Sequence, residues 1–291
     1  MFNKKSFNAF VYTLMTVCSL VAVLPIFLIV IVSITKESVL TEYGFSLIPR
    51  VIDFTAYKML FKDSGKVVWY TVWTLFLAIV RPLIVILVTV SYSYALTREK
   101  FIFKNFFTKF ILFTMFFSGG MIPTYVIVSN VYHLVDNPIY YFLEGWIAFS
   151  SVVIFRTFFK QVPQSLIEAA KIDGATESQV LMKVILPMST TIIGIQYFTA
   201  SIGIWNDYQT SLIYMFGNDK FWTIQYYMQR VLQDASFLKT SLIAAGLKAS
   251  DIPENGLKYA MCLFSLLPIF IIFPFVQKYF AKGIAVGSVK G

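Results

Sequence analysis

Charged residues are scarce in this 291-residue chain, at 13% of the total, while hydrophobic residues make up 58%. A soluble globular chain carries about 25% charged residues, so too little polar surface remains for a shell that faces water on all sides. The two cysteines, Cys18 and Cys262, lie inside apolar runs. They exclude a disulfide framework and a CxxC metal site. The single histidine, His133, supplies neither a metal cluster nor a Ser–His–Asp arrangement, and we interpret it as a loop or interface residue.

Two motifs of enzyme chemistry are also missing. No G-x-x-x-x-G-K-[ST] phosphate loop occurs, because Ser64-Gly65-Lys66 has no glycine at the required upstream spacing, and no HExxH site exists. The sequence therefore predicts a protein that is not an enzyme, with no catalytic residues, no metal site and no cofactor of its own.

Long apolar runs are what the chain does contain. Crossing the hydrocarbon takes about 20 mostly apolar residues. Six stretches reach or approach that length: Phe10–Ile34, Val67–Leu96, Phe106–Val128, Ile139–Phe155, Met188–Phe216 and Leu257–Phe280. The fourth is only just long enough. We predict an all-α membrane protein with six transmembrane helices over residues 10–280.

The basic residues give a direction to these spans, since cytosolic segments favour Lys and Arg. With both termini placed inside, residues 1–9 and the tail 281–291 are cytosolic. The inner segments then hold 13 basic and four acidic residues, and the outer ones hold ten basic and eleven acidic residues. The formal charge of +9 is thus a topology signal, and we predict membrane lipid rather than nucleic acid as the surroundings.

Two connections stand out by their length. The outer segment 217–256 is long enough to have a function or to form an ordered element. On the inner side, residues 161–187 predict helix, sharp turn, helix. Ser165–Glu168 and Thr176–Gln179 each have the spacing of a capping box. Gly174 lies between them and can adopt the positive φ of a helix-ending turn.

The same inner segment carries a resemblance. Glu168-Ala169-Ala170-Lys171-Ile172-Asp173-Gly174 is followed, after nine residues, by Val184-Ile185-Leu186-Pro187. This pattern resembles the EAA loop of binding-protein-dependent ABC importers, in which EAA, three residues, glycine and nine residues precede I-x-LP. Val184 stands where isoleucine is usual. The resemblance implies the type I permease fold of these importers.

In that family the loop forms a coupling helix that docks into a cleft of a cytosolic ATPase dimer, which binds the ATP and Mg. Rigid docking would pass the movement of the ATPase to the spans. The resemblance implies an ATPase-coupling set made of Glu168, Ala169, Ala170, Asp173, Gly174, Leu186 and Pro187. An ordinary amphipathic cytosolic loop is the alternative.

Other stretches are similar to the carbohydrate-uptake branch and its maltose-type second permease, namely Ser91–Arg98, Phe117–Thr124, Arg156–Phe159 and Lys278–Gly291. They imply an oligosaccharide or complex sugar as the substrate. They also imply a second permease subunit and an extracytoplasmic sugar-binding protein as partners, in the bacterial plasma membrane. By the same resemblance Ser288, Val289, Lys290 and Gly291 reach the ATPase dimer interface; a frayed terminus is the alternative.

Other functions stay open at this point. An importer for an amino acid, peptide or polyamine fits the EAA segment equally well. A secondary carrier, a membrane enzyme or a signalling protein would leave that segment unexplained.

Polar groups inside the spans suggest a substrate path, since ionisable side chains at membrane depth are costly. Arg81 lies in the middle of a span, with Glu144 as its candidate partner; either it serves the path or it makes a structural pair. Trp205, Asn206 and Asp207 combine an aromatic face with hydrogen-bonding groups, as sugar sites do. Their alternative role is to join helices through polar contacts.

Overall fold

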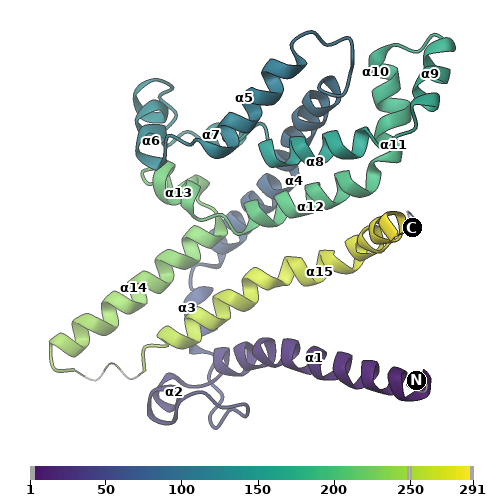
Figure 1. Ribbon diagram of the computed structural model, residues 1–291. Coiled ribbons are helices and arrows are strands. Elements are labelled where there is room, and N and C mark those ends of the chain that lie inside the picture. The colour runs from purple at the N-terminus through teal and green to yellow at the C-terminus, as the bar shows by residue number, and fades with distance from the viewer. Residues whose placement is uncertain (1–3, 248, 250, 289–291) are drawn as a thin grey trace. The chain divides into compact units, whose positions relative to one another are not determined.

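The computed structural model describes residues 4–247, 249 and 251–288, most of them in helices (Figure 1). In these ranges the only strand-like feature is an isolated antiparallel bridge between Thr35 and Ile52. The all-α prediction is therefore confirmed. The chain divides into two compact units. One holds the described residues up to Val68 with Tyr227–Pro268, and the other holds Trp69–Tyr226 with the described residues from Ile269 on.

The first unit contains helices from both ends of the chain. They are α1 (Lys4–Ser33), α2 (Glu37–Tyr43), α3 (Thr55–Leu60), the start of α4 (Ser64–Ala95), most of α14 (Ile224–Ala244) and the start of α15 (Glu254–Ser288). Most described side chains of α1 are exposed although they are apolar. Such a surface fits a helix that faces lipid, where every backbone group is bonded within the helix itself.

Glu37 holds three of these helices together. Its carboxylate is only 1% exposed and accepts hydrogen bonds from Lys239 Nζ at 3.3 Å and from Asn255 Nδ2 at 2.9 Å. The backbone amides of Asn255 and Gly256, at the start of α15, donate to its other oxygen at 3.1 and 3.3 Å. A buried carboxylate is tolerated only when it is paired and hydrogen-bonded in this way. Glu37 thus anchors the end of the outer segment 217–256.

The second unit contains the remaining helices. They are α5 (Lys104–Phe116), α6 (Met121–Asn130), α7 (Tyr140–Leu143), α8 (Phe149–Phe159), α9 (Gln164–Ile172), α10 (Glu177–Val180), a π-helical turn (Leu181–Ile185), α11 (Leu186–Met188), α12 (Thr190–Trp205), α13 (Gln209–Tyr214) and a 3-10 turn (Asp219–Phe221). The long helix α4 provides residues to three buried clusters of this unit, namely Val90 and Tyr94 to the first, Leu77 to the second and Tyr92 to the third.

Three of the predicted spans are not continuous helices, which corrects the expectation for 106–128, 139–155 and 188–216. The first of them splits into α5 and α6, which meet at 111°. Gly120 ends that break with φ +86°, a conformation that a continuous helix of L residues cannot use. The second contains only the four-residue α7 and the 11-residue α8, with Gly145 at φ +63° between them. The third is interrupted between Trp205 and Gln209, where α12 ends and α13 begins.

The number of crossings depends on how these broken elements are counted. Among the described residues, three helices are long and apolar enough to cross a bilayer: Phe7–Ser33, Ser64–Ala95 and Glu254–Pro274. Two bent pairs, α5 with α6 and Glu177–Met188 with α12, raise the number to five if each is one span. Six crossings with both termini in the cytosol stay a prediction.

In its described residues, the outer segment 217–256 contains the 21-residue helix α14. Its start is fixed at Gly217, whose amide donates to Asp136 Oδ1 at 2.8 Å. A β-carbon at position 217 would lie 2.5 Å from Asp136 Oδ2, so any other residue there requires the Asp136 side chain to move. The indole N–H groups of Trp69 and Trp73 donate to the carbonyls of Lys220 and Phe221, at 2.6 and 3.1 Å. The segment is therefore attached to α4.

Candidate functional site

The inner segment 161–187 has the bent helical form that its sequence predicts. Helix α9 ends at Ile172, Gly174 turns the chain with φ +82°, and α10 begins at Glu177. In Figure 1, α9 and α10 lie next to one another at the upper right, and α11 lies below α10. The predicted capping box at Thr176 is confirmed, because its hydroxyl accepts from the Gln179 amide while the Gln179 side chain accepts from the Thr176 amide.

The other predicted capping box, at Ser165, is wrong. Helix α9 begins one residue earlier, at Gln164, and its N-cap is Pro163, which makes no side-chain cap. Ser165 therefore already lies in the first helical turn. Pro163 has no side-chain acceptor, so it cannot cap the first amides of α9 as a serine N-cap would.

One face of this segment packs against the ends of the long helices. Ile167, Val180 and Ile185 are buried in a cluster with Tyr94 of α4 and with α8 and α12. Ala170 and Leu186 are half-buried and pack against the same cluster. These two members of the predicted coupling set thus face the interior of their own unit. The segment is joined to three helices of this unit by apolar burial.

The opposite face is exposed and mixed in character. Glu168, Ala169, Asp173 and Pro187 lie on it. At its edge, Ile172 is 86% exposed at the last position of α9. A large apolar side chain at the tip of a well-packed hairpin leaves an apolar contact for another molecule.

Glu177 links this segment to α4, and the sequence did not single it out. One of its carboxylate oxygens accepts from the Tyr94 hydroxyl at 2.6 Å, and the other binds Lys171 Nζ at 2.6 Å. The Arg98 guanidinium lies 4.4 Å from the centre of the Tyr94 ring. Burial alone would raise the pKa of Glu177, but the bonds from Lys171 and Tyr94 outweigh it and lower the pKa. The signal in the sequence was a tyrosine near the end of an apolar run.

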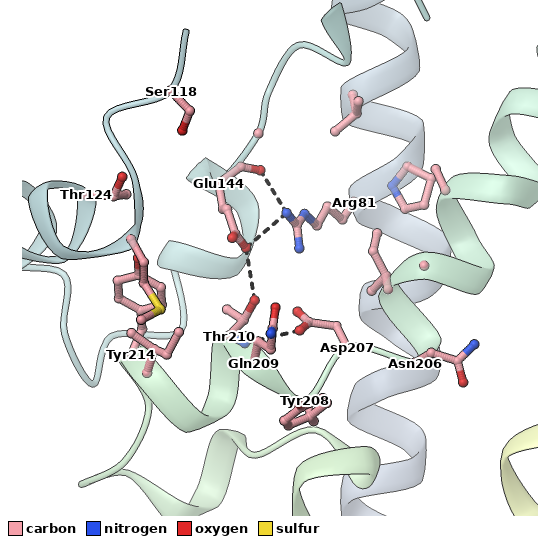
Figure 2. A pocket seen from close by; sticks show the side chains of 18 of the residues that line it. Arg81, Ser118, Thr124, Glu144, Asn206, Asp207, Tyr208, Gln209, Thr210 and Tyr214 are labelled. Carbon is pink, nitrogen blue, oxygen red and sulfur yellow. Dashed lines mark hydrogen bonds and ion pairs between the residues drawn. The ribbon is translucent and has the colours of Figure 1, made fainter. Parts of the chain in front are cut away.

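A second feature of this unit is a cavity of about 740 Å³ beside the middle of α4. Figure 2 shows the Arg81 guanidinium directed at Glu144, which lies between Arg81 and Thr210. Arg81 Nη2 donates to Glu144 Oε2 at 3.1 Å and to the Glu144 carbonyl at 3.0 Å. Thr210 Oγ1 donates to the same carboxylate oxygen at 3.1 Å. The predicted pairing of Arg81 with Glu144 is confirmed; a role in a substrate path stays a prediction.

The structure separates the other residues predicted for the path. Asn206 and Asp207 line the cavity, together with Tyr208, which follows them in the same polar and aromatic stretch, and with Gln209, which the sequence did not single out. Trp205 is buried and is not part of the cavity wall. Gln209 could have been predicted from its position close to Asn206-Asp207, because these two poor helix formers mark a break inside an apolar run.

The structure says little about the predicted contact of the C-terminal tail. Val289, Lys290 and Gly291 lie outside the described residues, and Ser288 is the last residue of α15. Across the described ranges, no group of three or more His, Cys, Asp or Glu side chains is arranged to hold a metal ion.

The chain combines long apolar helices, helix breaks that bring polar side chains to one cavity, and a bent segment packed against helix ends. These features together are typical of a membrane transport subunit. Comparison with known proteins gives its family. Residues 87–286 match the family described as binding-protein-dependent transport system inner membrane component. The chain belongs to this family, and is therefore a multi-pass permease component of the bacterial plasma membrane and not an enzyme.

Individual relatives agree with this family. The chain is 32% identical to Protein LplC of Bacillus subtilis, with 93% of this chain and 90% of that protein covered. It is 29% identical to the polygalacturonan/rhamnogalacturonan transport system permease protein YtcP of the same species, over 99% and 100%. A solved chain of a bacterial ABC transporter involved in the import of the acidic polysaccharide alginate superposes with a TM-score of 0.70. It is 25% identical, and 96% of this chain and 99% of that chain are covered.

Proposed function

We propose that this chain is the permease subunit of an ATP-driven importer of an oligosaccharide or complex sugar. It forms half of the translocation path with a second permease and is coupled to a cytosolic ATPase dimer through residues 161–187. An extracytoplasmic sugar-binding protein delivers the substrate. The names of several relatives support a saccharide, among them the arabinooligosaccharides transport system permease protein AraQ of Bacillus subtilis, which is 27% identical to this chain.

The observation that carries the coupling role is the two-faced segment 161–187. Its inner face is buried against α4, α8 and α12, so a force on the segment acts on all three helices. Its outer face presents Ile172 at the tip, with Glu168 and Asp173 beside it. An apolar side chain flanked by carboxylates suits a partner groove that has an apolar floor and a basic rim.

Replacing Ile172 by serine tests this role. Burial of an isoleucine side chain contributes about 1.5–3 kcal/mol, so we expect the ATPase to bind roughly 10- to 100-fold more weakly. The measurement is the amount of ATPase that co-purifies with tagged full-length chain from native cells, along with its rate of ATP hydrolysis. Ile102→Ser is the matched control, because Ile102 is 90% exposed on another predicted cytosolic loop. Equal ATPase recovery from both variants would contradict the docking role.

The alternative substrate class, an amino acid, peptide or polyamine, is separated by uptake. Cells that lack the chain should lose import of a labelled saccharide and keep import of the other solutes. The reverse result would assign the chain to a non-sugar importer.

A further inference from the structure

Three interrupted elements meet at the cavity beside α4. The break between α5 and α6 supplies Ser118 and Gly120, the connection of α7 to α8 supplies Glu144, and the break between α12 and α13 supplies Asp207. Arg81 faces them from near the middle of the 32-residue α4. At membrane depth, irregular backbone is tolerated only where it is buried in protein or lines a water-filled space. That three breaks border one cavity favours an aqueous site.

The polar groups of this cavity are only partly used within the chain. Arg81 donates through Nη2 alone, and its Nε and Nη1 make no hydrogen bond to another described residue. Glu144 Oε1 and Asp207 Oδ2 accept none from the described chain, while Asp207 Oδ1 accepts from the Thr210 amide at 3.1 Å. Unused donors and unused acceptors therefore stand side by side. Sugar hydroxyls are donors and acceptors at once, so neighbouring hydroxyls on one ring match this arrangement.

The charges of the cavity wall discriminate between kinds of saccharide. The ionisable acids and bases lining it are Arg81, Glu144 and Asp207, which leaves one net negative charge. The positive charge of Arg81 is already paired with Glu144 at 3.1 Å. A uronate unit would bring a third carboxylate close to Glu144 and Asp207, while the only positive charge of the wall, on Arg81, is already neutralised by Glu144. A neutral sugar does not meet this repulsion.

We propose that this cavity is a binding site within the subunit for a neutral, hydroxyl-rich saccharide, and that it disfavours uronate units. The inference rests on the proposed function, since it assigns a substrate class to the importer. Arg81 and the two carboxylates hydrogen-bond the hydroxyls. Tyr208, which lines the cavity and is 40% exposed, offers an aromatic face to the ring.

A reporter cysteine tests the site in the intact importer, purified through a tag on this chain. Cys18 and Cys262, which are both exposed, are first replaced by alanine. Gln209→Cys then places a thiol on the cavity wall, and Ile102→Cys places one on an exposed loop as the control. The rate of thiol modification is measured with a cationic and an anionic methanethiosulfonate reagent.

The charge predicts the ratio of the two rates. The ratio of the cationic to the anionic modification rate is first measured for free 2-mercaptoethanol. One net negative charge at ~7 Å from the thiol, in a water-like dielectric, should make the same ratio at position 209 about five- to tenfold higher. Asp207→Asn should remove most of this preference. Slow reaction with both reagents, as for a thiol that faces lipid, would refute an aqueous site. A preference for the anionic reagent would refute the proposed charge.

Protection by saccharides tests the ligand class. Uptake by the wild-type importer is first measured with neutral pools, such as maltodextrins and arabinan fragments, and with galacturonate oligomers. The neutral pool that is imported should slow modification at position 209 and leave position 102 unchanged. Equal or stronger protection by galacturonate oligomers, or no protection by an imported pool, overturns the inference while the importer function stands. If no saccharide is imported, the proposed function fails as well, and the uptake assay alone reveals it.

Discussion

The bond between Tyr94 and Glu177 gives the sharpest test of how the inner segment is attached. Tyr94→Phe removes one hydroxyl and leaves the ring in its buried cluster. A hydrogen bond to a charged group is worth about 1.5–3 kcal/mol. The Glu177 side chain is 50% exposed and keeps Lys171, so water can replace the lost donor. We therefore expect a cost at or just below the lower limit of this range, about 1–1.5 kcal/mol.

This loss should appear as easier local opening of α10. An opening equilibrium changes about tenfold for each 1.4 kcal/mol, so amide hydrogen exchange over residues 175–181 should rise roughly five- to tenfold. The assay is hydrogen–deuterium exchange with mass spectrometry on the tagged importer complex. If the bond also transmits movement to α4, the number of ATP molecules hydrolysed per saccharide imported should rise.

Tyr92→Phe is the matched control. Tyr92 lies two residues earlier on α4, and its hydroxyl makes no hydrogen bond to a described residue. The same exchange rates in both variants would show that the hydroxyl of Tyr94 does not hold the segment. A double-mutant cycle with Glu177→Gln completes the test, because a coupling energy near zero would refute the interaction itself.

Two further predictions concern single positions. In Gly174→Ala the new β-carbon has no atom within 4 Å, so the cost is the strain of positive φ, about 1–2 kcal/mol. The apparent Tm of the complex should therefore fall. Gly194→Ala is the control, because its β-carbon is equally unhindered and lies inside a helix, and it should not lower the Tm. Glu37→Gln removes a buried carboxylate that accepts from Lys239 and leaves Lys239 paired with Glu254 alone at 3.1 Å, so it should cost about 1–3 kcal/mol. Proteolysis of the outer segment should then quicken, and Glu42→Gln on the same helix, where the side chain is exposed, should leave the cleavage rate unchanged.

The features that depend on local chemistry were predictable from the sequence. Gly174 takes positive φ, Thr176 caps α10, and the inner segment forms two short helices. Each follows from residues within a few positions of one another. The pairing of Arg81 with Glu144 was also predictable, because an unpaired charge at membrane depth costs too much to remain.

The helix breaks were not predicted, because hydropathy over a long window averages out two or three unfavourable residues. Ser118-Gly119-Gly120 and Asn206-Asp207 interrupt runs that are otherwise apolar enough to cross a bilayer. Their local preference for turns is only about 1 kcal/mol per residue. Whether such a preference wins depends on neighbours that can satisfy the freed backbone groups, and those neighbours come from distant parts of the chain.

The link from Tyr94 to Glu177 escaped prediction for a related reason. The two residues are 83 positions apart, and neither belongs to the part of the EAA pattern that carries the resemblance. Only the packing of the inner segment against the end of α4 brings them together.

The contact between Gly217 and Asp136 also bears on how this chain varies. Any side chain at position 217 would collide with the Asp136 carboxylate unless that carboxylate moved and gave up its hydrogen bond with the Gly217 amide. We therefore expect a homologue with a bulkier residue at 217 to have a shorter or reoriented side chain at 136, or a different course for the loop that carries it. Paired substitutions at positions 217 and 136 would therefore identify, from sequences alone, the homologues in which the outer segment starts in a different conformation.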